Sequence, residues 1–159
     1  MQMKDLAVIT YHPVDSTDEA FLYRLYASGR TEEMSNWGWD NSQQEAFLTM
    51  QFRAQRSQYD QYPNVSHRII LANDHPIGRL IVSEVEDELR LVDIMLLAEH
   101  RNAGIGTILI RELLDRATSL GKAVRLHVEK TNRAQRLYQR LGFVITAEKG
   151  SHYLMQWRA

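Results

Sequence analysis

The chain has 159 residues, of which 44% are hydrophobic and 25% are charged, a composition typical of a globular protein with one substantial core. Its 19 Lys and Arg and 20 Asp and Glu residues give a formal net charge of −1, which argues against a nucleic-acid binder that depends on a large basic field. The absence of cysteine excludes disulfides, thiolate metal sites and a cysteine nucleophile.

Hydrophobic periodicity and turn signals divide the chain into strands and helices. Residues 1–11 hold Lys4, Asp5 and only a short apolar stretch, which predicts neither a signal peptide nor a membrane span and makes a cytoplasmic location the default. The predicted elements, in chain order, are a strand at 4–11, helices at 15–30 and 41–62 with a loop at 31–40 between them, strands at 67–73, 77–87 and 88–98, a helix at 105–121, a strand at 122–130, a helix at 131–143 and two strands within 143–158.

The order β-α-α-β-β-β-α-β-α-β-β predicts one domain, residues 1–159, of the α/β (mixed α+β) class. We expect a central, mostly antiparallel mixed sheet of about seven strands with four helices. Parallel pairing is expected only between 89–97 and 123–129, because a helix separates these two strands.

The stretch "HRNAGIGT", residues 100–107, places two glycines where a strand runs into a helix. The first turn of a helix leaves several backbone N–H groups unpaired at its partially positive end, and glycine lets phosphate oxygens approach them. The alternative is a tight turn with no ligand, and the spacing alone leaves both open. The loop is not a P-loop, because no Gly-Lys-Ser/Thr follows, and it lacks the third glycine of a dinucleotide fingerprint.

Two motifs together resemble a known family. Arg101-x-x-Gly104-x-Gly106 at the start of a long helix is similar to the acetyl-CoA pyrophosphate loop of the Gcn5-related N-acetyltransferase (GNAT) superfamily, whose pattern is Gln/Arg-x-x-Gly-x-Gly/Ala. The stretch "NRAQRLYQRLGF", residues 132–143, resembles the second signature of that family, in which a tyrosine precedes Leu-Gly-Phe. The motifs stand in the family's order, separated by a helix and a strand. The resemblance implies the acyl-CoA N-acyltransferase fold, with acetyl-CoA as co-substrate.

The resemblance also implies how the co-substrate is held. Ile94, Met95 and Leu96 would contact the pantetheine arm through their main chain, and they are equally compatible with being core strand residues. Asn132 would reach the pantetheine or the adenine side; Thr131 is the alternative for this role, and either residue also suits a helix cap. The loop residues implied in pyrophosphate binding are Arg101, Asn102, Ala103, Gly104, Ile105, Gly106 and Thr107.

Acetyl transfer to an amine requires a proton for the departing thiolate, and the resemblance gives this role to Tyr138. The competing interpretation is a core tyrosine on a helical stripe. The main-chain N–H near Leu96 is the expected oxyanion donor. His127 is the candidate general base, since histidine titrates near neutrality; Glu84 and Asp93 compete with it, and each of the three also fits a simple hydrogen-bonded polar group.

The acceptor is expected to be a primary amine of a small molecule or of a peptide or protein, attacked directly in a ternary complex. Trp37 and Trp39, with Phe52, Tyr59 and Tyr62, would help to line its site; the alternative is that Phe47, Met50 and Phe52 pack their helix on the sheet. The other histidines share no metal-ligand spacing, so no metal is expected. Neither nucleic acid nor membrane is an expected partner. A catalytically silent acyl-CoA sensor of the same fold is the alternative function, and a homodimer, with the alternating apolar residues of 151–159 covered by a partner, stays open.

Overall fold

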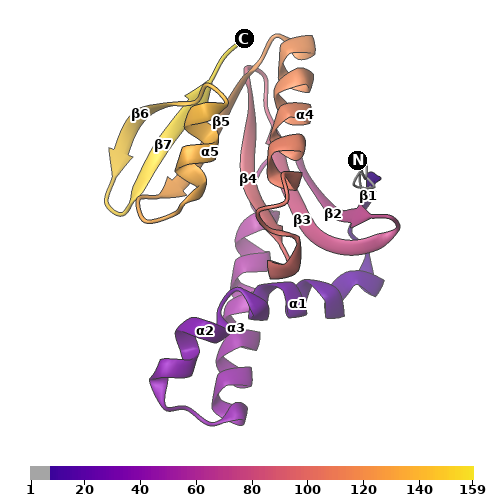
Figure 1. The fold of residues 1–159 in the computed structure, drawn as a ribbon, viewed down its shortest axis with the longest axis vertical. Helices are drawn as coiled ribbons and strands as arrows, with labels where there is room; N and C mark the ends of the chain where they lie inside the picture. The colour runs from indigo at the N-terminus through magenta and orange to yellow at the C-terminus, as the bar shows by residue number, and fades with distance from the viewer. Residues whose placement is uncertain (1–7) are drawn as a thin grey trace, which may run out of the picture. The chain divides into compact units, whose positions relative to one another are not determined.

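The computed structural model describes residues 8–159 and shows a seven-stranded sheet in the order β1-β2-β3-β4-β5-β7-β6 (Figure 1). The pairs β1–β2, β5–β7 and β6–β7 are antiparallel, and β4–β5 is parallel as predicted. The strands are β1 (Ile9–Pro13), β2 (Val65–Ala72), β3 (His75–Glu84), β4 (Glu88–Leu96), β5 (Ala123–Glu129), β6 (Val144–Lys149) and β7 (His152–Trp157). The helices are α1 (Glu19–Ser28), α2 (Thr31–Met34), α3 (Asn41–Asp60), α4 (Ile105–Leu120) and α5 (Ala134–Arg140), with single 3-10 turns η1 (Ser16–Asp18), η2 (Ser35–Trp37) and η3 (Ala98–His100).

The chain forms two compact units, and β3 and β4 each contribute to both. The first unit comprises Met1–Gln61, Ser66–Ile81 and Ile94–His100. The second comprises Tyr62–Val65, Val82–Asp93 and Arg101–Ala159.

The core of the first unit lies where α1 and α3 pack with β2. Its buried members are Phe21, Leu22, Leu25, Tyr26, Met34, Leu48, Phe52 and Ile69, with Met95 and Leu97 packed against them. Helix α3 begins with a capping box, in which the Asp40 carboxylate accepts from Gln43 N and the Gln43 side chain accepts from Asp40 N. This cap fixes the residue at which α3 begins.

A close backbone approach joins β3 to the end of β4 within the first unit. A Cβ placed on Gly78 would lie 2.2 Å from the Met95 carbonyl oxygen and 2.9 Å from Leu96 Cδ2, so only glycine fits there. Leu97 N donates to the Ile77 carbonyl at 2.8 Å immediately beyond this contact. The position of the Met95 peptide group therefore depends on a residue of the neighbouring strand.

The second unit has one apolar and one polar sheet face. Leu89, Leu91, Val124, Leu126 and Met155 are at most 4% exposed, whereas Arg125 is half-buried and His127 is exposed on the opposite face. Gly142, just after α5, lies against the Trp157 ring, since a Cβ placed on it would be 3.2 Å from Trp157 Cδ1. Strand alternation thus separates the residues of β5 into two chemically distinct sets.

The observed elements follow the predicted order, and their bounds differ locally; for example, the helix predicted at 131–143 spans only Ala134–Arg140. The first strand begins at Ile9 and ends at Pro13, so it extends beyond the predicted end at residue 11; residues 4–7 of the prediction lie outside the described part. The predicted loop 31–40 contains α2 and η2, since Thr31, Glu32, Glu33 and Met34 can close one helical turn without a long apolar stripe. Within residues 8–159, no helix is long and apolar enough to cross a membrane.

Candidate active site

The glycine loop turns sharply into α4. Asn102 (φ 60°) and Gly104 (φ 81°) both adopt the left-handed conformation, and Gly104 is the N-terminal cap residue of the helix. The first helical hydrogen bond runs from Ile108 N to the Gly104 carbonyl, so the N–H groups of Ile105, Gly106 and Thr107 precede the i→i−4 ladder. Arg101 to Gly104 are exposed. The loop therefore presents the positive end of a 16-residue helix at the surface.

Gly106 has no structural reason to be glycine. Its φ is not positive, and a Cβ added to it would meet only Leu137 Cδ2, at 3.6 Å, which is an ordinary contact. Glycine inside a helix nevertheless costs about 1 kcal/mol relative to alanine. Gly104 differs, because its left-handed backbone strains any other residue. Bare backbone at Gly106, in the first turn of the helix, fits a bound phosphate group, whereas a tight turn alone explains only Gly104.

The parallel ladder between β4 and β5 is short. It pairs Glu88–Leu91 with Ala123–Leu126 and ends there, although β5 continues to Glu129 and pairs with β7 along its whole length. Within the second unit, Val92 and Asp93 therefore have no register partner on β5. Ile94, Met95 and Leu96 follow in the first unit as half-buried residues, with the Met95 carbonyl held over Gly78.

Tyr138 lies on α5 next to the glycine loop, since its neighbour Leu137 is the residue closest to Gly106. The side chain is 6% exposed, and its ring packs against Phe143 with centroids 5.5 Å apart. Burial, and secondarily the negative charge of Asp93, raise the pKa of Tyr138 to about 12. The phenol is consequently a proton donor at neutral pH and not a phenolate.

His127 lies on the polar face of β5, opposite the face that carries Tyr138. Partial burial lowers its pKa, and the charges of Arg90, Lys149 and His152 lower it further. The imidazole is therefore neutral near pH 7 and able to accept a proton. The two predicted catalytic residues thus belong to the same unit but face opposite sides of the sheet.

The two competing base candidates have different surroundings. Glu84 is engaged by cations, with Arg116 and Lys122 both ion-paired to its carboxylate. Asp93 lies close enough to Tyr138 to raise the pKa of the phenol. Asp93 is thus the alternative general base that lies beside the predicted acid, Tyr138. Glu84 fits the other interpretation, that of an ion-paired polar group without a catalytic role. Among residues 8–159, no three His, Asp or Glu side chains are grouped so that they could hold a metal ion.

Asn132 stabilises the start of α5. Its Oδ1 accepts a hydrogen bond from Ala134 N at 2.8 Å, while its own N–H donates to the Glu129 carbonyl. This bond is an Asx turn one residue ahead of the cap residue Arg133, whose own side chain makes no cap hydrogen bond, and it gives Asn132 a structural role like the one that the sequence left open as an alternative to co-substrate binding.

The predicted acceptor residues form an aromatic cluster in the first unit. Trp37, Trp39 and Phe47 contact one another edge to face, with centroids 5.1–5.5 Å apart, and both indoles remain more than one-third exposed. Phe52 is buried in the core, as expected for ordinary packing. A hollow of about 530 Å³ also lies in this unit, lined entirely by α3 residues.

Sequence reasoning missed Gly78 and Glu88. Gly78 was detectable as an isolated glycine within a strand pattern, a known sign of close backbone approach. Glu88 is 7% exposed and accepts from both Arg90 and Arg125, at 3.4 and 3.2 Å, through one oxygen. Nothing local signalled this contact, because it depends on the β4–β5 register that places Arg90 opposite Arg125.

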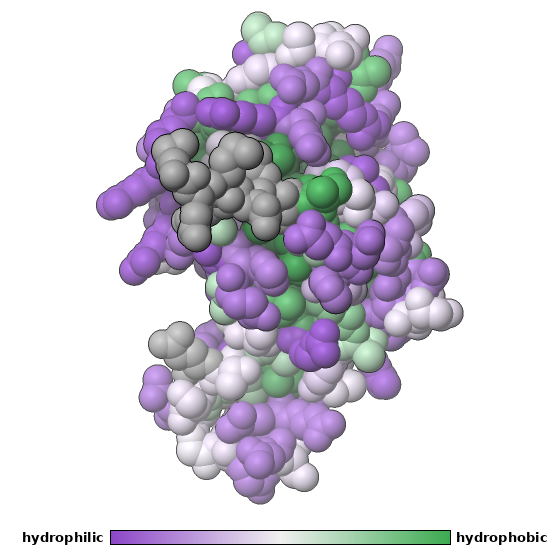
Figure 2. All heavy atoms as spheres, turned by 45° about the vertical axis from the view of Figure 1, so that its right-hand side comes forward, coloured by the Kyte–Doolittle hydropathy of each residue, from purple (hydrophilic) through white to green (hydrophobic). Residues whose placement is uncertain are grey.

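The face of the molecule in Figure 2 is mainly hydrophilic, with hydrophobic residues showing between the polar ones. A buried set of apolar residues beneath such a surface is what the composition predicts.

Comparison with known proteins agrees with this geometry. The model of the acetyltransferase (GNAT) family matches residues 22–143. No curated protein sequence matches the chain significantly.

Solved structures share the fold over almost the entire chain. PaiA N-acetyltransferase from Thermoplasma acidophilum, in complex with coenzyme A, superposes with a TM-score of 0.71 at 17% identity, covering 96% of this chain and 99% of that one. The ribosomal-protein-S18-alanine N-acetyltransferase from Escherichia coli has a TM-score of 0.64 at 18% identity, covering 95% and 94%. Spermidine N-acetyltransferase from Vibrio cholerae, in complex with CoA and spermine, has a TM-score of 0.63 at 20% identity, covering 94% and 95%.

Proposed function

Because this chain belongs to the acetyltransferase (GNAT) family, we propose that it is an N-acetyltransferase that transfers an acetyl group from acetyl-CoA to a primary amine, with residues 1–159 as one catalytic domain. The acceptor in this proposal is a small molecule or a peptide or protein. The related folds support both classes, since one belongs to a spermidine N-acetyltransferase and another to a ribosomal-protein-alanine N-acetyltransferase.

The observation that carries the proposal is Gly106. The residue weakens the first turn of α4 without serving a left-handed backbone or a tight internal contact. An anion that must approach the helix N-terminus explains it, and the pyrophosphate of acetyl-CoA is such an anion. In this proposal the main chain of residues 101–107 holds the pyrophosphate, the main chain of Ile94–Leu96 contacts the pantetheine arm, and Asn132 contacts the co-substrate in addition to capping α5.

Acetyl-CoA, when bound, supplies an activated carbonyl and a thiolate leaving group. His127 accepts a proton from the incoming ammonium, so that the amine nitrogen can form the new C–N bond as the C–S bond breaks. The nitrogen loses its second proton to water once the C–N bond has formed, and the Tyr138 phenolate left by protonation of the sulfur regains a proton from water. The main-chain N–H of Leu96 donates to the reacting oxygen. The Tyr138 phenol gives its proton to the departing sulfur, which its raised pKa allows at any pH near neutrality.

The placement of Tyr138 and His127 on opposite sheet faces supports this division of labour. The acid serves the leaving group and the base serves the nucleophile, so the two roles need two separate side chains rather than one. The β4–β5 ladder ends at Leu91 and Leu126, which supports the same interpretation because Val92 and Asp93 have no register partner on β5.

Calorimetric titration with acetyl-CoA and with CoA tests the proposal. We expect saturable binding by the wild-type protein and a loss of about tenfold or more in affinity for a bulky replacement, Gly106→Phe, which would occupy the approach to the helix N-terminus. Gly106→Ala is the matched control: its Cβ makes only an ordinary contact, so it should bind as the wild type does and be at least as stable in thermal unfolding, because alanine favours the helix.

Two outcomes separate the alternatives. Absence of binding to the folded wild-type protein would refute the acetyltransferase proposal. Binding without release of free thiol in a screen of amine acceptors would instead favour the silent acyl-CoA sensor.

A further inference from the structure

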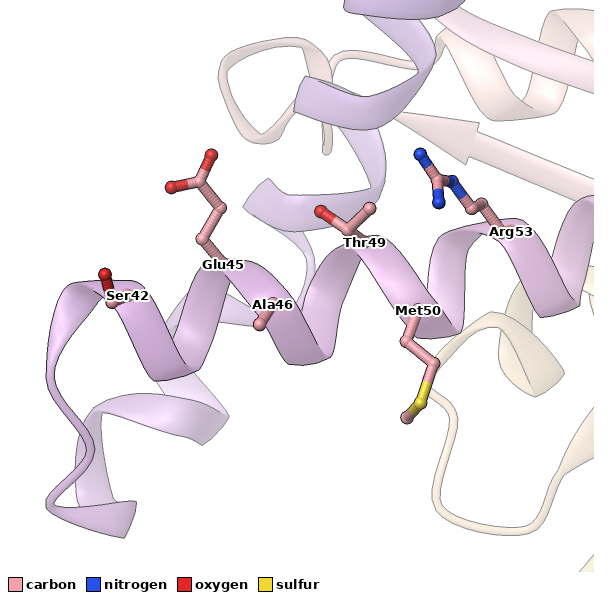
Figure 3. A pocket seen from close by; sticks show the side chains of 6 residues that line it. All are labelled: Ser42, Glu45, Ala46, Thr49, Met50 and Arg53. Atoms are coloured by element: carbon pink, nitrogen blue, oxygen red, sulfur yellow. The ribbon is translucent and has the colours of Figure 1, made fainter.

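The outer face of α3 carries two parallel rows of side chains. One row is Ser42, Ala46 and Met50, and the other is Glu45, Thr49 and Arg53; within each row the residues are four positions apart. Figure 3 shows Glu45, Thr49 and Arg53 rising from one side of the helix and Met50 pointing to the other. Rows with this spacing are the ridges by which helices interlock. The hollow of about 530 Å³ lies over these six residues.

This face carries one large apolar side chain that is exposed to solvent. Met50 is 61% exposed, whereas its row neighbours Ser42 and Ala46 are small. The long, flexible Met50 side chain therefore protrudes next to two small side chains, Ser42 and Ala46, in the same row. This combination of a protruding and a recessed position fits a surface that packs against its own copy, because the protrusion of each copy can enter the recess of the other.

The charges of the second row are self-complementary. Glu45 and Arg53 lie equally far from Thr49, on either side of it, and are about 12 Å apart along the helix axis. Neither forms an ion pair with any residue of the part of the chain that the structure describes. A two-fold axis passing near Thr49 would bring Glu45 of each copy opposite Arg53 of the other, and thereby satisfy all four charges.

We propose that this face of α3 binds the same face of a second copy of the chain, as an antiparallel helix pair in which Glu45 of each copy lies opposite Arg53 of the other and Met50 enters the hollow beside Ala46. The contact is isologous and closes after two copies. A single helix pair buries less than the roughly 800 Å² per partner of a standard interface, so dissociation in about the micromolar range is expected. Because the charge pairs lie at a partly exposed interface, added salt weakens the dimer.

Charge exchange tests the proposal by sedimentation over protein concentrations from about 1 μM to about 1 mM. The wild-type protein should pass from monomer to dimer within this range. Glu45→Arg and Arg53→Glu, each alone, place like charges opposite each other and should raise the dissociation constant about tenfold or more. The double variant Glu45→Arg/Arg53→Glu restores opposite charges and should dimerise within about threefold of the wild type.

Two further variants separate the proposed contact from general effects of charge. Met50→Ala should weaken the dimer without any change in charge. Arg111→Glu on α4 alters the net charge as Arg53→Glu does, but at an exposed position of the other unit, and should leave dimerisation unchanged. All substituted side chains are solvent-exposed, so the unfolding transition of each variant should match that of the wild type.

Three results would overturn the proposal. The first is a wild-type protein that stays monomeric over the whole range. The second is a dimer that both single charge variants leave intact, which would place the interface elsewhere, as on the C-terminal strands. The third is a double variant that fails to regain the dimer lost in the single variants, which would exclude the antiparallel pairing.

Discussion

The substitution Gly78→Ala probes how the end of β4 is positioned. The new Cβ would lie 2.2 Å from the Met95 carbonyl oxygen, whereas an ordinary contact between carbon and oxygen is about 3.3–3.6 Å. The Met95 peptide group or β3 must therefore move by about 1 Å. Such overpacking typically costs about 1–3 kcal/mol, and the reduced freedom of the unfolded chain offsets about 0.4–1 kcal/mol of it. We expect a net loss of about 1–2 kcal/mol in the free energy of unfolding, or about 2–8 °C in Tm.

Gly29→Ala is the matched control, because its new Cβ would meet the side chain of Met95 and not the Met95 backbone. A Cβ at Gly29 would lie 2.5 Å from Met95 Cε, the far end of a side chain with three rotatable bonds. Gly29 has φ −77°, which alanine adopts without strain. The Met95 side chain can turn away while its peptide group stays in place, so this variant should change stability by no more than about 0.5 kcal/mol.

The binding assay connects this packing to the proposed function. If the Met95 peptide group contributes one main-chain hydrogen bond to the co-substrate, losing about 0.5–1.5 kcal/mol should weaken acetyl-CoA binding by about two- to tenfold in Gly78→Ala. Gly29→Ala should bind as the wild type does. Equal stability and affinity for Gly78→Ala and the wild type would refute the reasoning, as would equal damage from both variants, because the backbone contact would then have no separate role.

Three other predictions follow from the titrating residues. Tyr138→Phe should lower kcat by about 10²–10⁴-fold while leaving the calorimetric affinity for CoA unchanged, and the wild-type rate should show no alkaline loss due to this phenol below about pH 10, since its pKa is raised to about 12. If the His127 imidazole is the base, His127→Gln should remove the acidic limb of the pH profile of kcat/KM. Because the pKa of His127 is lowered, that limb lies below pH 6.5. An unchanged pH profile would point to Asp93 as the base. Burial and the charge of Arg79 lower the pKa of His67 to about 4. The stability that the neutral imidazole contributes is therefore present above pH 6.5 and is lost as the pH falls through 4, and His67→Gln should flatten this pH dependence of the free energy of unfolding. Chemical unfolding across this pH window measures it, and parallel curves for the two proteins would contradict the prediction.

Local signals in the sequence were sufficient for most of the fold. The apolar stripe of α4 and the alternation in β5 are periodic, and the tight β2–β3 turn at Asn73 and Asp74, both left-handed, lies where turn-forming residues interrupt two apolar runs. The single turn of α2 was missed because four residues are too short to show a period. The sequence could identify Tyr138 as a candidate, but not its distance from Asp93 or its burial, since both depend on how α5 packs on the sheet.

Gly106 and Gly78 show the physical reason why some residues of a site can be predicted from the sequence and others cannot. Gly106 can be recognised from its local sequence, because glycine weakens a helix start and the neighbouring residues already reveal that a helix begins there. Gly78 is required by the Met95 carbonyl, which is 17 positions away and reaches it only after β3 and β4 have paired. A local pattern can indicate that such a strand glycine accommodates something, but only the register between strands identifies what it accommodates. The same argument applies to Glu88, whose two arginine partners come together only in the β4–β5 ladder, and it explains why residues that position a site are harder to predict than those that carry its chemistry.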